Sequence, residues 1–437
     1  MNKIAQSLNK AIQESNSHIF DMLSNMGKEL FFPKGILSQS AEAKEKAYKI
    51  NATIGIAKED NSVMSLSSIT DSIKGIDPDE YLPYASSFGL PELREKWKQE
   101  LIRKNPSLQG KNFSLPVATC GITHAVSIFA DLWTNPGDTI ILPDMMWGNY
   151  NMTFGVRKNV KIAQYASFNK ELTSYNLDSF ENLVKEQAQI SDKIIVLLNF
   201  PHNPTGYSLS VNEAKKIAGI LKEIAEKGTN VIAVCDDAYF GLFYEEETMK
   251  ESLFSLLTDL DERILAVKLD GATKEDYVWG LRIGFITYGL SLDQDNIAIY
   301  EALEKKTAGC IRGNVSNISH LSQTILLKSM GSKDYLLKKN EKFDLLMNRC
   351  MAIKDVVRDS AYKEYFDVYP FNSGYFMCIR LKENNAEKLR IHLLEKYGLG
   401  LISIGENNLR VAFSCVEKKD LKILFDIIAK GINDLRA

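Results

Sequence analysis

Four side chains that could take part in nucleophilic and acid–base chemistry occur in a fixed order along the chain. Asn203, Asp236, Tyr239 and Lys274 each come just after a short run of mainly apolar residues. The amine of Lys274 can act as a nucleophile or as a base, and the carboxylate of Asp236 can stabilise a cation. The amide and the phenol supply hydrogen bonds. The order of these groups indicates one site that contains a reactive amine.

The segments that would position these side chains alternate between short strands and longer helices from about residue 115 onward. Such alternation predicts βαβ units around a mostly parallel sheet with helices on both faces, which is an α/β fold. Ligands bind such sheets at the carboxyl ends of the strands. Residues 203–206 must turn sharply before a helix that begins near Ser210. The predicted strands include TIILP (139–143), KIIVLLNFP (193–201), NVIAVCDDAY (230–239), ILAVKLD (264–270) and GFITYG (284–289).

Each of these residues has a simpler explanation when it is taken alone. Asn203 belongs to an Asn-Pro-Thr-Gly turn, and Asp236 and Tyr239 would suit a surface loop equally well. Lys274, eight positions before Arg282, would be an ordinary surface lysine. Their order on three successive strand ends is more specific than any one of them.

The sequence around Lys274 resembles the fold type I pyridoxal-5′-phosphate (PLP) enzymes, and specifically the class I aminotransferases. The second half of their motif S-x-[ST]-K-x7-R-x-G is matched by Thr273, Lys274, Arg282 and Gly284. The resemblance implies that Lys274 holds PLP as a Schiff base, which an incoming amino acid displaces, and that the freed amine moves the Cα proton. It also implies that Arg282 and Thr273 bind the phosphate.

Other positions match further cofactor contacts of this family. The resemblance assigns Asp236 to the pyridine nitrogen of PLP, Asn203 and Tyr239 to the ring oxygen, and Asp237 to a place outside the site. Trp147, in MMWGNY, matches the aromatic residue that stacks on the ring. The segment TCGITHA matches the helix start that binds the phosphate, which implies roles for Gly121, Ile122 and Thr123.

Two positions depart from the family pattern around the phosphate. Gly271 stands where the motif has a serine, and Ile122 stands where a hydroxyl residue is often found. The phosphate would therefore lose two donors. Thr123, or Asp270 with a bridging water, would compensate for them.

The resemblance extends from Asn51 to Arg410 and includes residues for the substrate. INATIGIAKED (50–60) is similar to the family's glycine segment and implies that Gly55 lies near the substrate carboxylate. Arg410, in NNLRVAFSC, matches the arginine that grips the α-carboxylate. Tyr81, in YLPYASSFGLPELR, matches a residue that reaches the phosphate of a neighbouring subunit. The resemblance thus implies a homodimer with shared active sites.

Substrate choice depends on a second arginine. CIRGNVSN (310–317) resembles the segment in which aspartate aminotransferases bind a side-chain carboxylate with an arginine of the other subunit, so Arg312 is the candidate. It would favour aspartate, glutamate and their 2-oxo acids. Val315 replaces the tyrosine of that segment, and Ile318-Ser319 replace two prolines, so a structural salt bridge at Arg312 is the alternative.

Composition limits the other classes of function. With 437 residues, 45% hydrophobic, and a formal net charge of −3, the chain predicts a large core and a small-molecule partner, with no attraction to nucleic acid or membrane. No long apolar stretch or apolar leader is present, so we expect a cytoplasmic location. The six cysteines, without C-x-x-C pairs, predict reduced core residues and no metal site.

The expected organisation has an arm and part of a small domain in residues 1–75, a large PLP-binding domain in 76–335, and the remainder of the small domain in 336–437. Apolar spacing predicts one amphipathic helix within residues 1–30.

The proposed reaction is a ping-pong transamination. A β-lyase, decarboxylase or racemase on the same scaffold is the first alternative. A PLP-sensing regulator is a poorer one, because residues 1–50 are too few for a DNA-binding head. No G-x-G-x-x-G motif follows a strand, which argues against a nicotinamide enzyme.

Overall fold

The computed structural model describes residues 1–31, 35–292, 298–383 and 385–436. Within these ranges the largest sheet has seven strands in the order β4-β10-β9-β8-β7-β5-β6. Strands β5 to β9 pair in parallel, and β10 is antiparallel to both of its neighbours. The predicted α/β class with a mostly parallel sheet is confirmed. The strands are β4 (Val117–Thr119), β5 (Thr139–Pro143), β6 (Lys161–Tyr165), β7 (Lys193–Asn199), β8 (Asn230–Asp236), β9 (Ile264–Asp270) and β10 (Gly284–Gly289).

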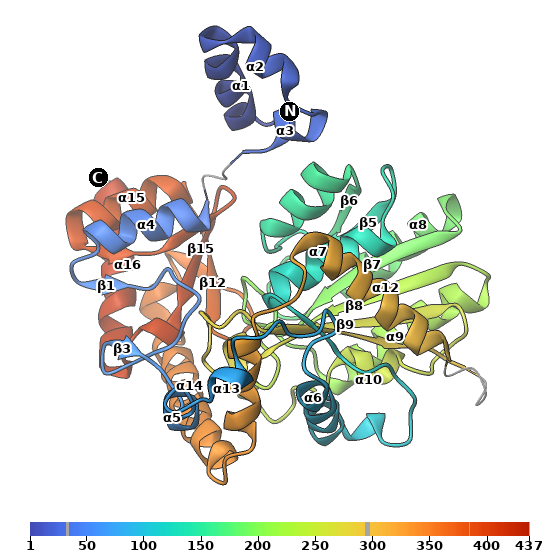
Figure 1. Ribbon diagram of the computed structural model, residues 1–437. Helices are drawn as coiled ribbons and strands as arrows, with labels where there is room; N and C mark the ends of the chain where they lie inside the picture. The colour runs from blue at the N-terminus through green and yellow to red at the C-terminus, as the bar shows by residue number, and fades with distance from the viewer. Residues whose placement is uncertain (32–34, 293–297, 384, 437) are drawn as a thin grey trace.

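Helices cover both faces of this sheet (Figure 1). Helices α7 and α12 pack on each other, while α9 packs against both α8 and α10. Strands β7, β8 and β9 are buried along almost their whole length, as parallel strands covered on both faces should be. The helices of this part are α6 (Pro91–Lys104), α7 (Gly121–Trp133), η3 (Asn151–Arg157), α8 (Leu177–Ile190), α9 (Val211–Glu226), α10 (Leu253–Leu257), α11 (Ala272–Glu275), α12 (Ala298–Asn314) and α13 (His320–Met330), with short turns η1 (Pro78–Glu80) and η2 (Pro106–Leu108).

A smaller part combines the C-terminal quarter of the chain with an N-terminal segment. Its antiparallel sheet has the order β11-β12-β15-β14, and β1 pairs in parallel with β13. Figure 1 shows blue N-terminal and red C-terminal elements side by side in this part. The predicted boundaries at residues 75 and 335 stay a prediction. Its elements are α4 (Ile36–Lys46), β1 (Ile50–Asn51), β2 (Lys58–Glu59), β3 (Ser62–Val63), α5 (Ser67–Ser72), α14 (Tyr335–Val357), η4 (Ser360–Tyr362), β11 (Phe366–Val368), β12 (Phe376–Leu381), α15 (Ala386–Tyr397), β13 (Leu399–Gly400), β14 (Ile402–Ile404), β15 (Asn408–Ala412), η5 (Phe413–Cys415), η6 (Lys418–Asp420) and α16 (Leu421–Arg436).

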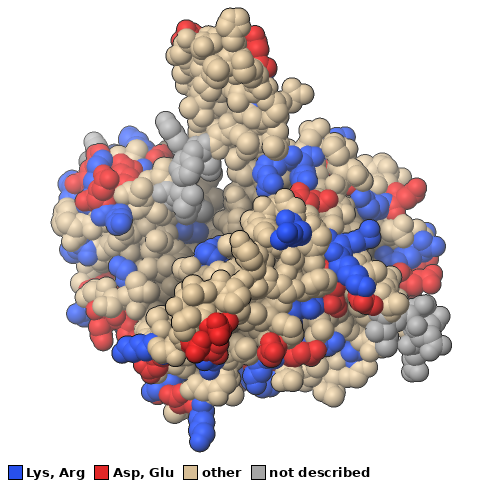
Figure 2. Space-filling view, in the orientation of Figure 1, with Lys and Arg blue, Asp and Glu red and all other residues tan. Residues whose placement is uncertain are grey.

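The prediction of a single helix within residues 1–30 is wrong. Three short helices occupy this segment, α1 (Lys3–Ser15), α2 (Ser17–Met22) and α3 (Asn25–Glu29). Asn16 caps α2 and Ser24 caps α3, because both side chains accept hydrogen bonds from the next turn and their backbones are extended. The three helices stand apart from the rest of the chain in Figure 1 and form a projecting lobe in Figure 2, and α3 touches η3.

The cysteines do not all lie in the core. Cys235, Cys350 and Cys378 are buried, Cys310 and Cys415 are half-buried, and Cys120 is exposed. The prediction of a core position is therefore wrong for Cys120, which directly precedes α7. None of the helices in the described part of the chain combines the length and the apolar character needed to cross a bilayer.

Candidate active site

A pocket of about 550 Å³, partly open to solvent, lies at the carboxyl ends of β7, β8 and β9. These strands are neighbours in the sheet, so residues that follow them converge although 71 positions separate Asn203 from Lys274. Nine of the twelve lining residues are among the predicted ones, and Tyr150, Asn199 and Ala238 are not. The lining residues are Ile122, Thr123, Trp147, Tyr150, Asn199, Asn203, Asp236, Ala238, Tyr239, Thr273, Lys274 and Arg282.

Lys274 lies on the single helical turn α11, just past the end of β9. Its Nζ donates a hydrogen bond of 3.3 Å to the carbonyl of Gly55 and lies 5.4 Å from the ring centre of Tyr239. Burial lowers the pKa of Lys274 to about 8, with help from the positive charges of Arg282 and Arg410. The amine is therefore partly neutral near physiological pH, as a nucleophile must be.

Asp236 is the last residue of β8 and is buried. Its Oδ2 accepts a hydrogen bond of 2.6 Å from the Tyr150 hydroxyl, and its Oδ1 accepts one of 3.2 Å from the N–H of Ala238. Burial raises the pKa of Asp236 to about 6 against the lowering effect of these donors. A carboxylate in this position favours a cation in the pocket.

Asn199 holds the ends of two adjacent strands together. Its Oδ1 accepts a hydrogen bond from the N–H of Asn203, and its Nδ2 donates to the carbonyl of Asp236. After the turn at residues 203–206, helix α9 begins with a capping box, in which the side chains of Ser210 and Glu213 each accept a hydrogen bond from the other's backbone N–H. Asn199 was not predicted as a site residue, although an amide at the end of an otherwise apolar strand could have indicated it.

The start of α7 and the guanidinium of Arg282 form a cradle for an anion. The first N–H groups of α7, from Gly121 onward, have no partner within the helix. A Cβ built on Gly121 would lie 2.6 Å from Arg282 Nη2, so only a glycine lets the guanidinium approach the helix start. Thr123 and Thr273 add hydroxyl groups to the lining. Backbone N–H groups, a guanidinium and two hydroxyls suit a phosphate.

Gly271 and Ile122, the two positions that depart from the family pattern around the phosphate, have different surroundings. A Cβ built on Gly271 would lie 2.5 Å from the carbonyl oxygen of Ile283 and 2.7 Å from the Cα of Gly284. The backbone that carries Arg282 into β10 thus occupies the space of the serine in the family motif. Ile122 lines the pocket, and its N–H lies in the first turn of α7.

Arg410 lies on β15, beside the pocket, and is 2% exposed. Its Nη1 donates to Asn203 Oδ1 at 3.1 Å, its Nη2 donates to the carbonyl of Thr53 at 2.9 Å, and its Nε has no partner in the described chain. The guanidinium stacks on Phe376, 4.1 Å from the ring centre. Within the described ranges no carboxylate pairs with Arg410, so an anionic ligand would neutralise a desolvated charge.

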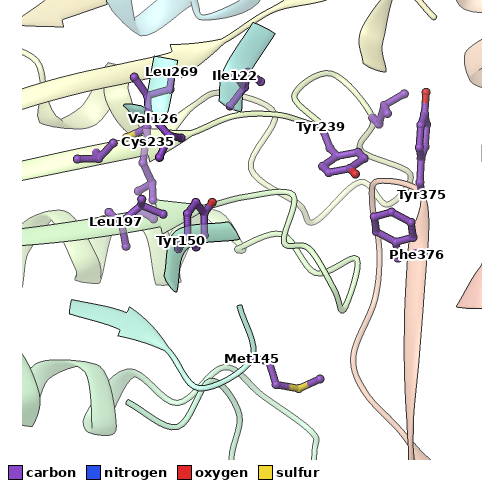
Figure 3. Close-up of a cluster of buried hydrophobic side chains, with 14 of the residues drawn as sticks. Ile122, Val126, Met145, Tyr150, Leu197, Cys235, Tyr239, Leu269, Tyr375 and Phe376 are labelled. Carbon is purple, nitrogen blue, oxygen red and sulfur yellow. The ribbon is translucent and has the colours of Figure 1, made fainter. Parts of the chain in front are cut away.

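Aromatic side chains of the smaller part close the site around Tyr239. Figure 3 shows Tyr239 facing Tyr375 and Phe376, and its ring centre lies 5.3 and 5.4 Å from theirs. A Cβ built on Gly55 would lie 3.2 Å from the Phe376 ring, 3.5 Å from the Tyr239 hydroxyl and 3.9 Å from Lys274 Nζ. A side chain at position 55 would therefore crowd the Phe376 ring next to the amine.

Three polar residues considered in the sequence analysis lie outside this pocket, namely Asp237, Tyr81 and Arg312. Asp237 pairs instead with the buried Lys268 and accepts a hydrogen bond from Ser252. Tyr81, next to η1, and Arg312, exposed at the end of α12, do not line the pocket of their own chain. Their roles in a second subunit stay predictions.

Comparisons with known proteins identify the family and the fold. Residues 49–428 match the family described as aminotransferase class I and II. The chain is 28% identical to an aspartate aminotransferase of Sulfurisphaera tokodaii over 233 residues, so the match spans about half of each chain, 53%. It is 24% identical to a probable N-acetyl-LL-diaminopimelate aminotransferase of Bacillus subtilis over 78% of this chain and 79% of that one. A solved aminotransferase from Anaerococcus prevotii has the same fold, with a TM-score of 0.83, 24% identity, and coverage of 94% of this chain and 99% of the other.

Proposed function

Because the chain belongs to the class I and II aminotransferases, a family of PLP-dependent enzymes, we propose that it transfers an amino group between an L-amino acid and a 2-oxo acid. The observation that carries the proposal is one pocket with an amine of lowered pKa, a buried carboxylate and an anion cradle. These are Lys274, Asp236, and the start of α7 with Arg282.

The donor set fits the cofactor. Arg282, Thr123 and the N–H groups at Gly121 and Ile122 would hold the phosphate, and the glycine at position 121 keeps that cradle free of a Cβ. When bound, PLP supplies an electron sink for bonds at the substrate Cα.

Other side chains would orient the ring of the cofactor. Asp236 would pair with the protonated ring nitrogen, Asn203 and Tyr239 would bond the ring oxygen, and Trp147 would cover the ring face.

The chain's own groups then divide the work of the two half-reactions. Arg410 binds the α-carboxylate common to all amino acids, since it is desolvated and has a free Nε. Lys274 Nζ would take the proton from the substrate Cα and deliver it to the cofactor carbon that carries the amino nitrogen. Hydrolysis by water would then release the 2-oxo acid and leave the amino group on the cofactor, and a second 2-oxo acid would take up that amino group by the reverse sequence.

A substrate with a second carboxylate is the finer part of the proposal. Arg312 is exposed and donates a hydrogen bond of 2.6 Å to Ser316, so its guanidinium has donors left for a carboxylate. We expect Arg312→Ala to lower kcat/KM for aspartate and glutamate far more than for alanine. Arg358, exposed on a different helix end, gives the matched control Arg358→Ala. Equal losses for all three amino acids would remove Arg312 from the site.

A homodimer would bring Tyr81 and Arg312 to the pocket of a second copy. Their two segments touch, because His320 bonds the carbonyl of Pro83 and Ser87 bonds that of Ser316. The joined surface exposes large apolar side chains, Tyr84 at 90% and Leu82 at 71%, together with Val315 and Leu321. Exposed apolar groups gathered in this way are typical of an interface.

Sedimentation of paired variants tests the dimer. Leu82→Glu with Tyr84→Arg should convert a dimer to monomers and lower activity. Leu337→Glu places the same charge on an exposed apolar site of α14 and should leave the dimer intact. A wild-type protein that sediments as a monomer while fully active would contradict the shared site.

Absorbance titration of the purified enzyme with single amino acids tests the reaction itself. Amino donors should convert the cofactor band to that of its amine form, with release of a 2-oxo acid. Lys274→Ala should abolish this conversion, whereas Lys227→Ala, at an exposed helix end, should not. Release of CO2 or ammonia in place of a 2-oxo acid would instead identify a decarboxylase or a lyase. The cytoplasmic location stays a prediction.

A further inference from the structure

Tyr150 lines the pocket and also makes a direct hydrogen bond to the carboxylate of Asp236. It precedes η3 and is 1% exposed. Its hydroxyl donates to Oδ2 of Asp236 at 2.6 Å. Figure 3 shows the Tyr150 ring in the buried cluster that also holds Leu197 and Cys235 of the central strands. A side chain from one crossover segment therefore holds the carboxylate at the end of another strand, 86 positions away.

Within the described chain, Tyr150 is the one side chain that bonds the Asp236 carboxylate. The remaining donor is the N–H of Ala238, at the longer distance of 3.2 Å. Burial raises the pKa of Asp236, and the nearby Asp237 raises it further, whereas Tyr150 and Lys274 lower it. Loss of the phenol would leave a desolvated carboxyl that takes up a proton more readily.

The phenol is suited to this task because it stays neutral. Burial and the adjacent carboxylate raise the pKa of Tyr150 far above its usual range, and Tyr239 contributes in the same direction. A neutral phenol beside a carboxylate acts as the donor, which gives a short, charge-assisted bond. Its ring is fixed by an edge contact with Trp147, at 5.4 Å between centres, and by Phe154 at 6.4 Å.

We propose that Tyr150 is a positioning residue that keeps the Asp236 carboxylate ionised and fixed in the pocket, and so sets how tightly the protonated ring nitrogen of the cofactor is held. The inference rests on the proposed function for its last step. Its first step, the ionisation of Asp236, concerns the protein alone.

Tyr150→Phe tests the proposal because it removes one oxygen and keeps the packing of the ring. The matched control is Tyr165→Phe, which removes an equally short buried hydrogen bond, 2.6 Å to Tyr175, at a place that does not line the pocket. Bonds to charged groups contribute enough that we expect roughly ten- to hundredfold weaker binding of PLP to cofactor-free Tyr150→Phe. Tyr165→Phe should bind PLP as the wild type does.

Two further measurements separate positioning from a general loss of structure. In the holoenzyme, Tyr150→Phe should lower kcat while the KM for the amino donor changes little, because Arg410 still binds the substrate. In the cofactor-free protein, the infrared carboxyl band of Asp236, identified with Asp236→Asn, should titrate at higher pH in Tyr150→Phe than in the wild type.

The outcomes are distinct. Unchanged PLP affinity together with an unchanged carboxyl titration in Tyr150→Phe would overturn the proposal, as would equal losses of affinity in both variants. If the wild type neither binds PLP nor transaminates, the proposed function fails, and the carboxyl titration still decides whether Tyr150 controls the ionisation of Asp236.

Discussion

Gly271→Ala measures how strongly the local packing requires the glycine that replaces the serine of the family motif. The added Cβ would lie 2.5 Å from the Ile283 carbonyl oxygen and 2.7 Å from the Gly284 Cα, so one backbone segment must move. Overpacking of this kind costs about 1–3 kcal/mol, and contact with backbone on both sides places this case near about 3 kcal/mol. The unfolding entropy, roughly 2.1 cal/mol/K per residue, amounts to about 0.9 kcal/mol/K for 437 residues. We therefore expect the midpoint of thermal unfolding to fall by about 3 °C.

Calorimetry of the cofactor-free protein checks this value against a control from the same region. Gly280 is exposed, and a Cβ there would meet nothing within 4 Å, so Gly280→Ala should leave the midpoint nearly unchanged. Gly271→Ser should lose as much stability as the alanine variant, and should also bind PLP more weakly, because Arg282 moves with the displaced segment. A serine variant that is as stable as the wild type and binds PLP more tightly would refute the steric argument.

Three further predictions concern the charged side chains of Lys274, Arg410 and the buried Lys268. In the cofactor-free protein, the rate at which a lysine reagent labels Lys274, followed by mass spectrometry, should rise with pH and reach half its maximum near pH 8, because the amine is protonated below that pH. A midpoint near pH 10.5 would contradict the effect of burial on the pKa of Lys274. Arg410→Lys should raise KM at least about tenfold for every amino donor, because an ammonium lacks the fork that fits a carboxylate, and a loss confined to one donor would contradict that role. Lys268→Met leaves the Asp237 and Asp270 carboxylates without their ion-pair partner in the core and should cost about 3–5 kcal/mol at pH 8. The cost should be smaller at pH 5, because burial raises the pKa of Asp270 to about 6 and this carboxyl then takes up a proton; thermal unfolding at the two pH values measures the difference.

The predicted residues Asn203, Asp236 and Lys274 line one pocket because of a rule that needs no tertiary detail. Parallel strands end at the same edge of a sheet, so residues that follow β7, β8 and β9 had to meet if the alternating pattern was read correctly. Asp236 and Lys274 are therefore accessible to sequence reasoning even without a resemblance to a family.

Tyr150 illustrates what such reasoning misses. Its bond to Asp236 depends on where the segment after β5 crosses the ends of β7 and β8, and no local pattern determines that path. The nearby Trp147 was found because a family motif marks it. Gly271 was interpreted from the sequence as a lost hydroxyl, whereas the structure shows a contact between two backbones that has no sequence signature of its own.

The distribution of charge explains why the same pocket suits an anionic cofactor and an anionic substrate. Lys274, Arg282 and Arg410 face the single carboxylate of Asp236, so the described pocket carries an excess of positive charge when all four groups are ionised. That excess, together with burial, lowers the pKa of Lys274 and makes its amine available as a nucleophile. A phosphate beside Arg282 and a carboxylate beside Arg410 would each remove part of the excess. In the proposed reaction, the charge that lowers the pKa of Lys274 in the free protein would also bind the two anionic groups, and their binding would make the amine more basic, which suits a proton acceptor for the substrate Cα.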